Sequence, residues 1–129
     1  MHLRLWNRGW SVSAMLGAFL IFAGWAQTPA AALELVMFQQ VGCPYCAEWN
    51  AAVGPGYPKS AEGKLAPLRR VDIHQPIPGD LTGVLVEPVT PVFVVVDNGK
   101  EIGRIRGYPG ADFFWFLLDQ VLAKVPDKP

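Results

Sequence analysis

The sequence has few side chains suited to redox or metal chemistry, since only two of its 129 residues are cysteines and two are histidines. So few cysteines exclude a small scaffold held together by several disulfides. Neither sign of charge predominates, because 11 basic residues balance 11 acidic ones. We therefore expect no nucleic-acid partner and no binding to an anionic membrane surface. The length allows one domain and little more.

The first 32 residues differ in character from the rest of the chain. Two arginines stand near the start, residues 11–25 are mostly apolar and uncharged, and residues 30–32 are three alanines. These are the three parts of a secretory signal peptide, with the alanines as its cleavage site. An uncleaved membrane anchor is the alternative, although a spanning helix usually needs about 18–20 apolar residues. We predict a signal peptide over residues 1–32 and an exported domain over residues 33–129.

Both cysteines lie in one motif, Cys-Pro-Tyr-Cys at residues 43–46. An apolar run at residues 33–38, typical of a buried strand, precedes the motif, and a helix-like segment follows it. Pro44 suits the first turn of that helix, which places Cys43 at its N-terminus, where backbone amides and the helix dipole favour a thiolate. We predict a redox pair in which Cys43 is the nucleophile and Cys46 resolves the mixed disulfide.

Two other interpretations of the cysteine pair stay open. It could be a static disulfide, which an exported protein can keep. It could also be half of a metal site, but tetrahedral zinc needs further ligands, and His74 is the only histidine in the predicted mature chain. We therefore expect no metal and no cofactor, and we place His74 on the surface because no acid or base partner stands near it.

The rest of the predicted domain alternates between strands and helices. Strands are expected at residues 68–73, 92–96 and 101–106, and a last helix at residues 111–124. Asn98-Gly99 predicts a type I′ hairpin between the last two strands. The first two strands, joined by a helix, should be parallel. The sequence therefore predicts an α/β fold, with a four-stranded mixed sheet and helices on both faces.

This order of elements resembles the thioredoxin superfamily, with the cysteine motif after the first strand and Thr90-Pro91 before the hairpin. Among its exported members, the chain is similar to the thioredoxin-like proteins of bacterial sulfur-oxidation (sox) systems. That similarity rests on four segments, residues 43–50, 57–63, 66–73 and 107–115. The resemblance implies a thioredoxin-like fold that lacks the extra N-terminal strand and helix of ordinary thioredoxin.

The resemblance also implies roles for residues near the cysteines. Pro91 should carry a cis peptide bond and lie against the cysteine pair. The backbone of Thr90 should pair with an extended segment of the substrate, a form of strand addition. Pro44 and Tyr45, between the two cysteines, complete the expected substrate-binding residues.

The implied function is that of a periplasmic reductant that acts as a monomer. Its substrates would be exported proteins with disulfide or persulfide cysteines, such as a sulfur-carrier protein, and a membrane thiol transporter would supply its electrons. One alternative is an oxidant that donates its disulfide to folding proteins. Another is a binding module with an inert structural disulfide. The Pro-Tyr dipeptide is of the glutaredoxin type and leaves a glutathione-linked activity open.

The sequence departs from ordinary thioredoxin at two places near the cysteines. Gly42 replaces the tryptophan that precedes the first cysteine. The buried acid of the preceding strand has no counterpart, because residues 35–38 are apolar and Glu34 is too near the start of the strand. We therefore expect water or the substrate to take the proton from Cys46.

Overall fold

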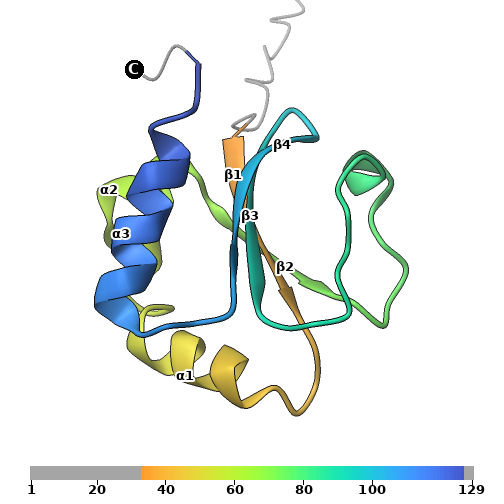
Figure 1. Cartoon of the computed structure of the whole chain (residues 1–129), viewed down its shortest axis with the longest axis horizontal. Helices are drawn as coiled ribbons and strands as arrows, with labels where there is room; N and C mark the ends of the chain where they lie inside the picture. The colour runs from red at the N-terminus through yellow and green to blue at the C-terminus, as the bar shows by residue number, and fades with distance from the viewer. Residues whose placement is uncertain (1–32, 127–129) are drawn as a thin grey trace, which may run out of the picture.

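A computed structural model describes residues 33–126, which form a four-stranded sheet and three α-helices (Figure 1). The strands are β1 (Leu33–Gln39), β2 (Leu68–Asp72), β3 (Val92–Asp97) and β4 (Lys100–Arg106), in the order β2-β1-β3-β4. The helices are α1 (Pro44–Ala52), α2 (Ala61–Leu65) and α3 (Ala111–Leu122), with 3-10 helices η1 (Tyr57–Lys59) and η2 (Gly79–Leu81). The predicted signal peptide, residues 1–32, lies outside the described residues.

The pairing of the strands confirms the expected mixed sheet. Strands β1 and β2 run parallel, whereas β1–β3 and β3–β4 are antiparallel. Between β3 and β4, Asn98 and Gly99 have φ angles of 50° and 76°. A type I′ turn requires positive φ at both central residues, and the predicted hairpin is therefore confirmed.

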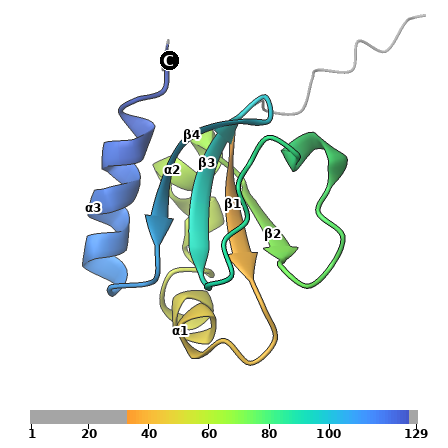
Figure 2. The same cartoon turned by 45° about the vertical axis from the view of Figure 1, so that its right-hand side comes forward.

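The side chains of β1 alternate between the two faces of the sheet. Leu35 and Met37 belong to a core on the face that the three α-helices cover, whereas Val36 and Phe38 belong to a second core on the opposite face. Figures 1 and 2 show the α-helices on one side and the loop between β2 and β3 on the other. The helical cover predicted for the second face consists only of η2, because prolines at 76, 78 and 88 interrupt that loop.

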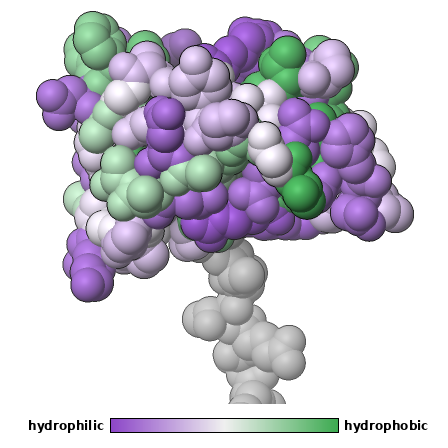
Figure 3. Space-filling view, turned by 90° about the horizontal axis from the view of Figure 1, so that it is seen from below, coloured by the Kyte–Doolittle hydropathy of each residue, from purple (hydrophilic) through white to green (hydrophobic). Residues whose placement is uncertain are grey.

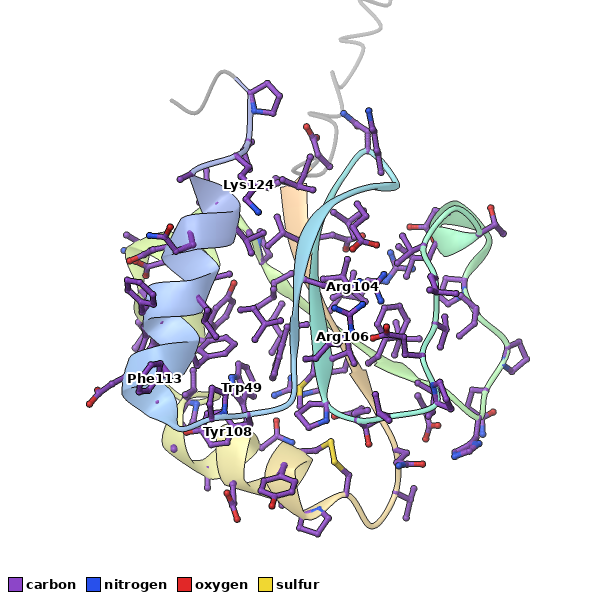
Figure 4. The ribbon with its side chains drawn as sticks, viewed as in Figure 1. Trp49, Arg104, Arg106, Tyr108, Phe113 and Lys124 are labelled. Carbon is purple, nitrogen blue, oxygen red and sulfur yellow. A yellow bond between two sulfur atoms is a disulfide. The ribbon has the colours of Figure 1, made fainter. Side chains whose placement is uncertain are left out.

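The core beneath the helices is built around Trp49 of α1, which is completely buried. Its ring centroid lies 5.1 Å from that of Phe93 on β3 and 5.4 Å from that of Phe114 on α3. Figure 4 shows Trp49 between α3 and the sheet. These contacts fix the position of α1, and with it the position of the cysteine motif at its start.

Ion pairs and hydrogen bonds connect the loop between β2 and β3 to the sheet. Arg106 of β4 binds Glu87 over 2.8 Å, and Arg104 donates to the carbonyl of Leu85 over 3.2 Å. Both arginines point from β4 toward this loop (Figure 4). At the other edge of the sheet, Arg69 of β2 binds Asp80 over 2.6 Å. The second core is thus closed by polar contacts at both edges.

None of the helices within residues 33–126 has the length and apolar content that crossing a bilayer requires.

Candidate active site

The cysteine motif lies where the chain turns from β1 into α1. Gly42 has a φ of 74°, a backbone conformation that favours glycine. This conformation suits the glycine that stands before Cys43 in place of the tryptophan of ordinary thioredoxin. Cys43 is the N-cap of α1, and Pro44 follows it in the first turn, as predicted. The motif therefore occupies the end of the sheet at which β1 and β2 finish.

The two sulfurs form a disulfide with an S–S distance of 2.06 Å. Cys43 is 9% exposed and Cys46 is 4% exposed, so Cys43 is the more accessible residue of the pair. The backbone N–H of Cys46 donates a hydrogen bond to Cys43 Sγ over 3.1 Å. After reduction this amide and the positive end of the helix favour a thiolate at Cys43, and the first turn of α1 holds no acidic residue to oppose it.

The segment that enters β3 lies beside this turn. The peptide bond between Thr90 and Pro91 is cis, as the resemblance implies. Pairing of Phe38 with Val92 carries the segment past the end of β1, where Gln40 donates a hydrogen bond to Thr90 Oγ1 over 3.0 Å. The backbone N–H and C=O of Thr90 make no hydrogen bond within the described residues. An extended peptide could therefore pair with them.

A groove with a volume of about 520 Å³ runs along the cysteine pair on the side of β2. Its lining includes both cysteines and the polar side chains of Gln39, Gln40, Asn50 and Asp72. None of these four polar residues was predicted from the sequence as part of the site. The signal that could have found Asp72 is its place at the carboxyl end of a strand parallel to β1, because such ends form the crevice of α/β sheets.

A second cavity, of about 320 Å³, has Tyr45 in its lining together with Arg106 and Tyr108. Tyr45 is 57% exposed and Val41, just before the motif, is 93% exposed. Figure 3 shows this end of the molecule, where hydrophobic and hydrophilic residues are interspersed. These exposed side chains can touch a partner that approaches Cys43.

The remaining candidates are a metal site and a functional role for His74. Within residues 33–126, no three His, Cys, Asp or Glu side chains gather as a metal site would require. His74 is exposed and its Nε2 lies 2.8 Å from Gln40 Oε1.

The chain is similar to three solved thioredoxin structures. The periplasmic thioredoxin SoxS from Paracoccus pantotrophus, in its reduced form, is 41% identical, with a TM-score of 0.66, and the match covers 71% of this chain and 97% of that one. Fasciola hepatica thioredoxin is 21% identical (TM-score 0.52, covering 70% and 81%), and Malassezia sympodialis thioredoxin is 18% identical (TM-score 0.51, covering 70% and 76%). No family model and no curated protein matches the sequence.

The last two structures support the fold alone, whereas the first shares both the fold and a large part of the sequence. With its Cys43–Cys46 disulfide at the start of α1, this chain therefore belongs to the thioredoxin superfamily and is a thiol–disulfide oxidoreductase.

Proposed function

We propose that this oxidoreductase works outside the cytoplasm as a reductant that keeps a cysteine of an exported partner protein in its reduced state. The observation that carries the proposal is the asymmetry of the two cysteines. Cys43 is the more accessible residue and its sulfur accepts a backbone N–H, whereas Cys46 is more deeply buried. The similarity to a periplasmic thioredoxin supports the location, and the signal peptide proposed for residues 1–32 would deliver the chain there.

The proposed reaction has two displacement steps. The Cys43 thiolate attacks a substrate disulfide, forms a mixed disulfide and releases one substrate sulfur as a thiolate. Cys46 then loses its proton and attacks Cys43 Sγ, so that the second substrate sulfur leaves with the electron pair of the broken bond. The substrate gains two electrons, and the cysteine pair is oxidised by two electrons to the disulfide. A persulfide substrate would react in the same way and release its outer sulfur as hydrosulfide.

The proposed docking site for the substrate lies around Cys43. Thr90 offers a backbone N–H and C=O that make no hydrogen bond to residues 33–126, beside the cysteine motif, and the exposed side chains of Val41 and Tyr45 flank this motif. A substrate segment in extended form would bond to Thr90 and bring its own sulfur to Cys43, with Pro44 and Pro91 in contact on either side. The partner we favour is a sulfur-carrier protein of a sulfur-oxidation system.

Covalent trapping tests this proposal. In a Cys46→Ser variant the mixed disulfide cannot be resolved, so a partner should stay attached to Cys43 through a bond that dithiothreitol breaks. The matched control is Cys43→Ser, which removes the nucleophile and should trap nothing. If periplasmic extracts yield no mixed disulfide with the first variant, the chain does not act on protein substrates as proposed. A binding module with an inert disulfide would instead retain its partner when both cysteines are replaced by serine.

The direction of electron flow is decided by the reduction potential of the cysteine pair. Reductants such as thioredoxin lie near about −270 mV, whereas a strong disulfide donor lies near about −120 mV. Equilibration with glutathione measures this potential, and we expect a value near that of thioredoxin. We also expect a membrane thiol transporter to reduce the cysteine pair. A value near the second figure would replace the proposed reductant with an oxidant of folding proteins.

A further inference from the structure

The second step of the proposed reaction needs a group that removes a proton from Cys46. Buried acids often serve this purpose, but the described residues contain no buried charged side chain. On β1, the strand that leads to the cysteines, Met37 is completely buried and faces the helices, and Glu34 lies at the other end, where it binds Arg69 over 3.1 Å. A protein base for Cys46 would therefore have to come from another element.

The end of β2 brings a carboxylate, that of Asp72, into the groove beside Cys46. Asn50 of α1 accepts a hydrogen bond from Arg70 of β2 over 2.9 Å, and this contact links the helix to the strand. Cys46 precedes Asn50 by one helical turn, about 6 Å along α1. Asp72 follows Arg70 by two residues on the same side of β2, about 7 Å along the strand.

Helix α1 runs across the end of the sheet at which β1 and β2 finish (Figures 1 and 2). Cys46, in the first turn of α1, and Asp72, the last residue of β2, line the same groove of about 520 Å³. Asp72 is the only aspartate or glutamate in the lining of that groove.

One oxygen of Asp72 is available for the reaction. Its Oδ1 accepts a hydrogen bond from the backbone N–H of His74 over 2.8 Å, which holds the carboxylate in place, and its Oδ2 has no protein partner within residues 33–126. The other charged or titratable groups here are otherwise engaged. The guanidinium of Arg70 binds Asn50, and the imidazole of His74 contacts Gln40. Asp72 is half-buried and lines the groove, so water can bridge it to Cys46.

We propose that Asp72 is the proton acceptor for Cys46 when Cys46 resolves the mixed disulfide, through a water in the groove. The proton passes from Cys46 Sγ to the carboxylate, the new Cys46–Cys43 bond forms, and the bond from Cys43 to the substrate breaks. The substrate leaves as a thiolate, and Asp72 later returns its proton to solvent. When the disulfide is reduced again, the same carboxylic acid protonates the departing Cys46. The inference rests on the proposed roles of the two cysteines.

The two steps can be timed separately with a symmetrical aromatic disulfide that releases a coloured thiolate. The first equivalent reports attack by Cys43, and the second reports resolution by Cys46. In Asp72→Asn we expect the first release within about twofold of wild type and the second slowed by about tenfold or more at pH 7, as for loss of a general base. Asp72→Glu should restore much of the second rate.

The pH profile separates proton transfer from other effects of the substitution. Without a base, resolution depends on the fraction of Cys46 present as thiolate, which rises about tenfold per pH unit below the ordinary thiol range. The second release should therefore climb steeply from pH 6 to 8 in Asp72→Asn and stay nearly level in the wild type. A purely electrostatic influence predicts the opposite change, because removal of a negative charge favours the thiolate and speeds the second release.

The matched control is Asp97→Asn, which removes an aspartate from the end of β3 that pairs with Leu33, at the far end of the sheet. It should leave both releases unchanged. If Asp72→Asn and wild type give equal second releases with the same pH profile, Asp72 is not the proton acceptor. If the wild type itself gives no second equivalent, the proposed roles of the cysteines fail instead, and the two failures are thus distinguished.

Discussion

The side-chain amide of Gln40 donates a hydrogen bond to the hydroxyl of Thr90 over 3.0 Å, across 50 positions of the sequence. Its carbonyl oxygen lies 2.8 Å from Nε2 of His74, so one side chain links the segment before the cysteines to two others. Gln40 also lines the groove beside Cys43. The hydrogen bond from Gln40 holds Thr90 at a fixed place relative to Cys43.

Replacement of Gln40 by alanine should therefore weaken the binding of protein substrates. A net hydrogen bond of about 0.5–1.5 kcal/mol corresponds to a rise of about two- to tenfold in KM for a protein disulfide such as that of insulin. Reduction of a small aromatic disulfide should change little, because such a substrate does not pair with Thr90. Gln39→Ala is the control, since Gln39 lines the same groove without a side-chain hydrogen bond to the described residues. Equal effects of the two substitutions would contradict this role.

The N–H of Cys46 that points at Cys43 Sγ leads to a second prediction, for the reduced protein. A sulfur at the start of a helix is present more often as the thiolate, which is the form that alkylating agents attack. We expect iodoacetamide at pH 7 to label Cys43 about tenfold faster than free cysteine, and Cys46 more slowly than Cys43. Peptide mass spectrometry after timed quenching identifies the labelled sulfur. Labelling of neither cysteine above the rate of free cysteine would contradict the proposed nucleophile.

The fold could be predicted from the sequence where local chemistry decides the structure. Pro44 marks the start of α1, and Asn98-Gly99 marks the hairpin, because each depends on the backbone preferences of one or two residues. The cover of the second face is less evident from sequence, because it depends on contacts such as Arg69–Asp80 rather than on periodicity. The prolines in that loop indicate only that no long helix can form there.

In the candidate site, too, residues in a local motif could be predicted, whereas residues that depend on long-range contacts could not. The two cysteines stand in one short motif and were identified from it. Gln40 and Asp72 were not, because each acts through a partner that lies far away in the chain. Asp72 lines the same groove as Cys46 because β2 pairs with β1 in parallel and because Arg70, two residues before Asp72, binds Asn50 of α1. No spacing in the sequence records these contacts.

Trp49 provides a third prediction, on stability. It is completely buried between Phe93 and Phe114, and its Nε1–H has no hydrogen-bond partner within the described residues. Trp49→Ala should lower the free energy of unfolding by about 3–5 kcal/mol, as for other large aromatic side chains in cores. Trp49→Phe keeps a ring in the core and removes an unpaired donor, so it should cost less than half as much. Urea unfolding of both variants measures the difference, and equal losses would contradict it.

The ion pair between Arg69 and Asp80 leads to a fourth prediction, on acid stability. The hydrogen bonds from the Arg69 guanidinium hold the pKa of Asp80 below its ordinary value of 3.8. Because the pKa is lower in the folded state than in the unfolded state, the pair stabilises the fold above about pH 4. This contribution is lost as the pH falls through the ordinary aspartate range toward the lowered pKa.

Asp80→Asn should therefore lower Tm slightly at pH 7, and the difference from wild type should shrink as the pH is brought to 3. The change should be small, since Asp80 is exposed and salt screens the pair. Asp119→Asn, at an exposed position of α3 without an ion pair among the described residues, is the control and should show no such trend with pH. A difference between wild type and Asp80→Asn that persists or grows at pH 3 would show that Asp80 contributes by packing rather than by charge.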